Sequence, residues 1–195
     1  MSAIIDKCFL GEASGHGHTM INKLVPKSLG IFVWRAIRGR LPVRLELDKR
    51  GIDLDSVRCP VCDTTLESVE LILLRCNLAN DVWNLVRRWW NCNDSIVTTG
   101  LIPLFNLEKR HNWSHDGNMV WQAVRWVAGY CIWKYSNDKV FKNISKSSAD
   151  IFNDIQVKSF EWVSKRAKNR SFMWHIWLLD PSFYGNSGLS RTGIG

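Results

Sequence analysis

The chain has 195 residues, of which 46% are hydrophobic and eleven are tryptophan, so it can build a packed core in one domain or two small ones. Its formal net charge of +8 favours a nucleic-acid partner. No apolar run approaches the ~20 residues that a membrane span needs. The first ten residues lack the pattern of a secretory signal, so we expect an intracellular protein whose six cysteines are metal ligands or free thiols.

The N-terminal residues 1–19 carry three glycines and no sustained periodicity, so we expect a loose segment. His16 and His18 lie between glycines there and are expected to be solvated rather than metal-bound.

Two helices are predicted next, the first from Pro26 to about residue 38 and the second from Pro42 to Lys49. Gly39 separates them, and Gly51 closes the second. Residues 20–50 contain many basic residues and only two acidic ones, Glu46 and Asp48. The candidates for nucleic-acid contact are Arg35, Arg38, Arg40, Arg44 and Lys49. A basic residue can also simply solvate a helix face, and that alternative stays open.

The sequence Cys59-Pro60-Val61-Cys62 has the spacing of a zinc turn, because two thiolates three positions apart can bind one tetrahedral ion. Cys76 follows after a short predicted helix and supplies a third thiol. We expect Cys59, Cys62 and Cys76 to converge. The alternative is that three buried thiols form part of an apolar cluster.

A fourth zinc ligand is missing from its natural place, one helical turn before Cys76, where Leu71 stands. Cys92 is excluded because the predicted helix 77–91 would place it more than ~20 Å from Cys76. Glu67 or a water molecule could complete the site, but more weakly than a histidine. Zinc is therefore a possible cofactor with three of its four ligands present.

The rest of the chain also has the helical period. Helices are predicted from Asn77 to about Trp90, over residues 118–142, and from Ser147 or Ser148 to about Lys165. Residues 174–178 are expected to fold back onto the last two helices. The tryptophans are interpreted as core rather than as platforms for base stacking. His111 and His115 are expected in a solvated loop. The predicted fold class is all-α.

No catalytic constellation is evident in the sequence. The chain has no adjacent aspartate pair of the kind that holds two metal ions in a polymerase, and no glycine-rich phosphate loop. It also suggests no small-molecule substrate. We therefore expect no enzymatic activity from this segment alone.

The cysteine region resembles a known family. Cys59-Pro60-Val61-Cys62, Glu67-Ser68-Val69-Glu70 and Arg75-Cys76 resemble the reverse-transcriptase zinc-binding domain at the C-terminus of plant LINE-type (non-LTR) retrotransposon polyproteins. In that family a histidine follows the second glutamate, and Leu71 replaces it here. Ile31 to Arg35 and Gly39 to Pro42 are similar to the segment leading into the family's domain. Ile132-Trp133-Lys134 and Phe160-Glu161-Trp162 resemble the tail that follows it.

The resemblance implies a nucleic-acid-binding accessory module of an RNA-directed DNA polymerase that acts in the nucleus. It also implies that a polymerase domain precedes this segment, whose start would then be a truncation or a mispredicted gene start. The alternative is a decayed or protein-interacting remnant of a retroelement. The domain organisation we expect is a loose segment 1–19, a zinc-binding-like domain 20–92, a linker 93–117, a helical region 118–183 and a disordered tail 184–195.

Overall fold

The structure, a computed structural model, describes residues 21–92, 100–106, 113–168 and 170–185. These residues form helices, turns and one isolated bridge between Arg58 and Leu66, without a β-strand, which confirms the predicted all-α fold. The elements in chain order are α2 (Lys27–Ile37), α3 (Arg44–Asp48), the π-helical turn η1 (Leu71–Arg75), α4 (Asn77–Trp89), α5 (Leu101–Phe105), α6 (His115–Lys142), α7 (Ser148–Arg166), α8 (Trp174–Leu179) and the 3-10 turn η3 (Pro181–Tyr184).

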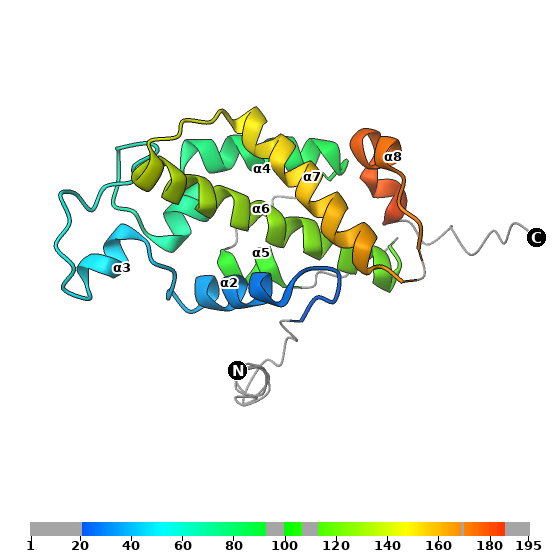
Figure 1. The fold of residues 1–195 in the computed structure, drawn as a ribbon, viewed down its shortest axis with the longest axis horizontal. Coiled ribbons are helices and arrows are strands. Elements are labelled where there is room, and N and C mark those ends of the chain that lie inside the picture. Colours follow the sequence, from blue (N-terminus) through cyan, green and yellow to red (C-terminus); the bar gives the residue numbers. More distant parts are fainter. Residues whose placement is uncertain (1–20, 93–99, 107–112, 169, 186–195) are drawn as a thin grey trace, which may run out of the picture.

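Helix α6 runs through the middle of the molecule and contacts α2, α4, α5, α7 and η1 (Figure 1). Its apolar residues lie on all sides of the helix, which is typical of a helix buried within a core. Helix α7 crosses over α6 and also packs on α4. Segments before and after residue 93 therefore share one core. In the part of the chain that the structure describes, no helix is both long and apolar enough to cross a lipid bilayer.

Side chains fix the ends of the two longest helices. Ser114 accepts a hydrogen bond from the Gly117 N–H (3.0 Å) and begins α6 three residues before the predicted start. His115 is therefore the first residue of a helix and not part of a loop, while His111 lies outside the described residues. Ser147, one of the two predicted caps, begins α7 through a reciprocal pair of hydrogen bonds with Asp150.

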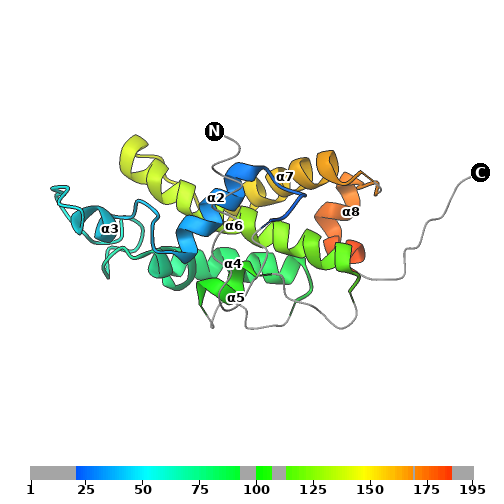
Figure 2. The ribbon, with the colours of Figure 1, turned by 90° about the horizontal axis from the view of Figure 1, so that it is seen from below.

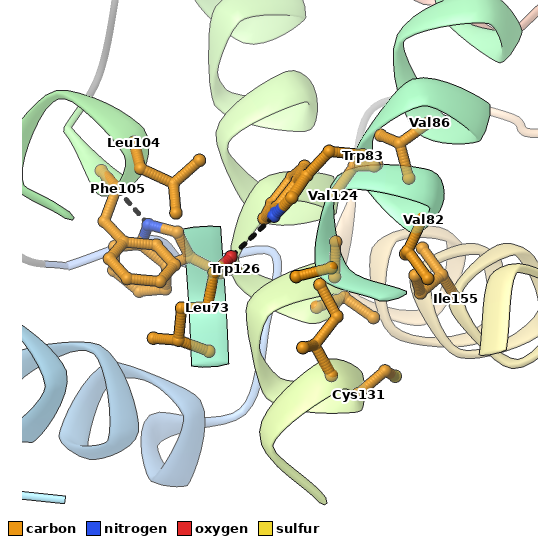
Figure 3. Packing of buried hydrophobic residues seen from close by; sticks show 14 of the residues in the cluster. Leu73, Val82, Trp83, Val86, Leu104, Phe105, Val124, Trp126, Cys131 and Ile155 are labelled. Carbon is orange, nitrogen blue, oxygen red and sulfur yellow. Dashed lines mark hydrogen bonds between the residues drawn. The ribbon is translucent and has the colours of Figure 1, made fainter. Parts of the chain in front are cut away.

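The tryptophans form much of the core, as predicted. The indole N–H groups of Trp83 and Trp126 donate to the carbonyls of Leu73 and Phe105, each at 2.7 Å (Figure 3). Five tryptophans are almost fully buried, namely Trp83, Trp90, Trp121, Trp126 and Trp177. Their burial supplies a large apolar area, and the indole N–H groups of Trp83, Trp126 and Trp177 donate to backbone carbonyls.

The stretch predicted as a linker, 93–117, contains the short helix α5, whose Leu104 and Phe105 are buried. Phe105 packs against Gly129 of α6, where an added Cβ would lie 2.9 Å from the phenyl ring. The absence of a side chain at Gly129 therefore lets α5 approach α6 closely. At the other end of the molecule, α3 and the loops beside it project beyond the packed helices (Figures 1 and 2).

Candidate metal centre

The loop that carries Cys59 and Cys62 is closed by its own backbone. The Cys59 N–H donates to the Thr65 carbonyl (2.8 Å), and the Asp63 N–H donates to the Cys59 carbonyl (2.9 Å). Asp63 adopts a left-handed conformation with φ of 52°, which an aspartate tolerates better than most residues. These contacts turn the chain tightly between the two cysteines.

The three predicted sulfur ligands converge. The Sγ atoms of Cys59, Cys62 and Cys76 all lie within 4.8 Å of one another. Cys59 and Cys76 are buried, and Cys62 is half-buried. Thiolates bound to one tetrahedral zinc lie roughly 4 Å apart, given Zn–S bonds of ~2.3 Å. The described sulfur atoms are therefore close to the arrangement that a metal requires.

Hydrogen bonds within the cluster make its thiols unequal. The Cys59 thiol donates towards Cys76, which together with burial raises the pKa of Cys59. The same hydrogen bond lowers the pKa of Cys76, helped by the backbone N–H groups of Leu78 and Ala79 at the start of α4. Backbone N–H groups thus favour a thiolate at Cys76, and a thiolate is the form that binds metal.

Leu71 occupies the first position of a π turn rather than of an α-helix. The Cys76 N–H donates to the Leu71 carbonyl five residues earlier (2.8 Å), and this hydrogen bond defines the wider turn. In an α-helix, five steps of 100° would place positions 71 and 76 about 140° apart. The wider turn reduces that angle and brings the two positions closer to one face. The prediction of a short helix was right, but its hydrogen-bond type was not visible in the sequence.

Glu67, considered above as a substitute ligand, does not join the sulfur cluster. Its Oε2 accepts from the Arg44 backbone N–H (2.8 Å) and its Oε1 from the Ser136 hydroxyl (2.8 Å). Both oxygens therefore connect the cysteine region to α3 and α6. The buried carboxylate serves as a structural link, and no further His, Cys, Asp or Glu of the described ranges belongs to the metal cluster.

Glu67 is expected to make stability depend on pH. Burial raises the pKa of Glu67 above its ordinary value of 4.5, and the hydrogen bonds from Arg44 and Ser136 oppose that rise. A raised pKa in the folded state favours folding below pH 4.5, and this contribution is lost as the pH rises through the folded-state pKa. Glu67→Gln can retain both contacts without the charge. It should therefore gain stability relative to the unmodified chain as the pH rises to neutrality, measured by urea unfolding.

Glu161→Gln is the matched control for this experiment. Lys165 lowers the pKa of the exposed Glu161, so the sign of the effect is reversed and the variant should lose stability relative to the parent as the pH rises. Equal pH dependence in the two variants would contradict the assignment of Glu67 as a buried carboxylate.

The five basic candidates for nucleic-acid contact differ in their surroundings. Arg35, Arg38, Arg40 and Lys49 are exposed, whereas Arg44 is half-buried and donates to the Arg58 carbonyl (3.1 Å). Lys49 also pairs with Glu46, and the Arg40 guanidinium lies 5.3 Å from the centre of the Trp34 ring. We define the α2–α3 face as these five residues. Through its hydrogen bond to Arg58, the Arg44 side chain also helps to hold the loop that leads to Cys59.

Comparison with known proteins gives one match. A family model described as zinc-binding in reverse transcriptase matches residues 7–83, a range that includes Cys59, Cys62 and Cys76. No curated protein and no solved structure matches the chain. The match agrees with the cysteine geometry, which shows a cluster able to hold a metal ion, and with a degenerate form in which Leu71 replaces one ligand.

Proposed function

We propose that this chain is a nucleic-acid-binding accessory module of a retrotransposon RNA-directed DNA polymerase, because residues 7–83 match a family model described as zinc-binding in reverse transcriptase. The observation that carries the proposal is the convergence of Cys59, Cys62 and Cys76 within 4.8 Å, inside the matched range. The module would belong to a plant-type non-LTR element and act in the nucleus.

Zinc is the metal that this donor set fits best, since clustered thiolates from a turn and a helix start are the usual ligands of structural zinc. Cys59, Cys62 and Cys76 would hold it, and the ion would link the loop to the start of α4. The fourth position lacks a protein donor among the described residues. The parent chain is therefore expected to hold zinc weakly.

The proposed partner is RNA or DNA, bound without sequence preference through the α2–α3 face. This region has a large excess of basic residues, and four of its five candidate cations are exposed. Such a face attracts phosphate backbones mainly through charge, so binding should weaken steeply with salt. Leu71 supports a second candidate, a decayed element that retains its fold without its function.

Charge reversal on the α2–α3 face separates these two candidates. Arg35→Glu/Arg38→Glu should weaken binding of a fluorescent oligouridylate by at least about tenfold at 50 mM salt and reduce the slope of log affinity against log salt by about 1.4. The measurement is fluorescence anisotropy at 50 and 200 mM salt. The control, Lys139→Glu/Lys142→Glu at the far end of α6, makes the same change in net charge. If both variants lose the same affinity for the oligonucleotide, binding depends only on the net charge of the protein. That result would contradict the proposal that the α2–α3 face is the binding site.

A further inference from the structure

The beginning of α2, the beginning of α6 and the end of α7 lie on the same side of the molecule (Figure 1). Residues from these three segments line a groove. Its volume is about 1020 Å³. It is lined by residues 21–27, by residues 165–168 with Arg170 and Phe172, and by residues from the first turns of α6. Most of this groove lies outside the matched range 7–83 and away from the cysteine cluster.

The groove is strongly basic. Its only acidic lining residue is Asp116, whereas six lining residues are cationic: Lys23, Lys27, Lys165, Arg166, Lys168 and Arg170. Apolar side chains lie between the charges, including Leu24, Met119 and Phe172. The combination of basic and apolar side chains is typical of sites that follow a phosphate backbone while the bases contact apolar surface.

Several of these cations have no acidic partner among the described residues. Lys23 and Lys168 are exposed and make no hydrogen bond or ion pair there. Arg166 contacts only the carbonyl of Trp162, at 3.4 Å. Lys165 differs because Glu161 neutralises it. Lys23, Arg166 and Lys168 therefore contribute positive charge that no acidic side chain of the described residues neutralises.

Arg170 gives independent support for an anionic ligand. Its Nη2 donates to the Tyr184 carbonyl (2.9 Å), and its guanidinium lies 5.8 Å from the centre of the Phe172 ring. Its Nη1 is enclosed and has no hydrogen-bond partner among the described residues. A buried, charged donor without a partner is costly, and a bound anion would remove that cost.

The start of α2 adds to the positive field. This helix of eleven residues begins in the groove wall after Pro26, and no side chain caps its first turn in the described structure. The positive end of the helix dipole favours anions at such a position. The lysines and arginines contributed by α7 and by the segment that follows it face the same space.

We propose that this groove binds the phosphodiester backbone of single-stranded nucleic acid. The inference rests on the proposed nucleic-acid function but uses a different site from the α2–α3 face. A concave site suits a flexible single strand better than the convex surface of a duplex, and the apolar side chains between the cations can contact unstacked bases. The chain would then hold nucleic acid at two surfaces, one beside the cysteine region and one formed by its C-terminal helices.

The test is a pair of charge reversals measured in the full chain. Lys23→Glu/Lys168→Glu changes two exposed groove cations from different lining segments, and Lys139→Glu/Lys142→Glu is the control of equal charge. Anisotropy is measured with fluorescent oligouridylate and oligothymidylate of about 12 nucleotides. The groove variant should bind at least about tenfold more weakly than the control, with a salt slope reduced by about 1.4 for two lost phosphate contacts. Circular dichroism checks that both variants keep their helices.

The remaining outcomes identify what would be wrong. Equal affinity of the groove and control variants for both oligonucleotides would overturn the proposal. So would a groove variant that loses only binding of polyglutamate or of anionic lipid vesicles, since the ligand would then be a peptide or a membrane. If only Arg35→Glu/Arg38→Glu weakens binding, the result supports nucleic-acid binding at the α2–α3 face and rejects binding in the groove. The reverse result would preserve the groove and reject the face.

Discussion

Leu71→His is expected to convert the chain into a protein that binds one zinc ion and resists unfolding in its presence. The change would add an imidazole one π turn before Cys76, which is one of the three converging thiols. A Cys3His set completes the tetrahedron that zinc prefers. Leu71 also borders a surface groove with Leu45 and Thr65, which gives the larger ring room to turn.

The effect should be large because a metal that binds only the folded state stabilises it by mass action. Free zinc at 100 times the dissociation constant adds about 2.7 kcal/mol to the free energy of unfolding. Zinc content is measured on the purified protein by elemental analysis, and melting temperature is measured with and without a chelator. The variant should contain one zinc per chain and lose thermal stability on chelation, and the parent should respond much less.

Two controls make this result specific. Leu178→His places the same residue on α8, away from the cysteines, and should take up no additional zinc. Cys59→Ser combined with Leu71→His removes one thiol and should abolish the gain. An equal response of the parent and Leu71→His to the chelator would reject the lost-ligand account, and the cysteines would then be explained as core.

Trp177→Ala should be among the most destabilising substitutions in the chain, with a cost of about 3–5 kcal/mol. Trp177 is fully buried, and its indole N–H donates to the Gln156 carbonyl (3.2 Å) of α7. Its ring packs at centroid distances of 5.7 to 6.1 Å against five other aromatic rings, those of Trp89, Trp90, Phe160, Phe172 and Tyr184. Removing it would leave a cavity and would remove one hydrogen bond to α7, although the Gln156 carbonyl still accepts from the Ser159 hydroxyl.

The same substitution tests whether the two halves of the chain unfold together. The Trp89 indole of α4 donates to the carbonyls of Trp177 (2.8 Å) and Leu178 (3.1 Å), so α8 is tied to the helix that follows the cysteines. Urea unfolding followed by tryptophan fluorescence and by circular dichroism should give coincident transitions, both shifted by Trp177→Ala. Trp174→Ala is the control, because Trp174 is 40% exposed and should cost only about 1 kcal/mol. Separate transitions would show that the halves fold independently.

The sequence alone determined the helices and the chemistry of the cysteine cluster. Apolar residues at spacings of three and four define α2, α4, α6 and α7, because helical period depends on local order along the chain. The spacing of Cys59 and Cys62 likewise determines that both can face one ion. The burial of the tryptophans followed from their size and number. Each of these properties depends on residues close together in the sequence.

Tertiary structure decided the properties that depend on distant residues. Glu67 lies 69 positions from Ser136, and only their contact shows that this carboxylate is a link to α6 and not a ligand. Arg125, charged and fully buried, is held by the carbonyls of Pro103 and Asn106, which no local pattern announces. The basic groove is assembled from segments more than a hundred residues apart. Packing, and not local order, determines where such segments meet, so their combined charge becomes visible only in the folded chain.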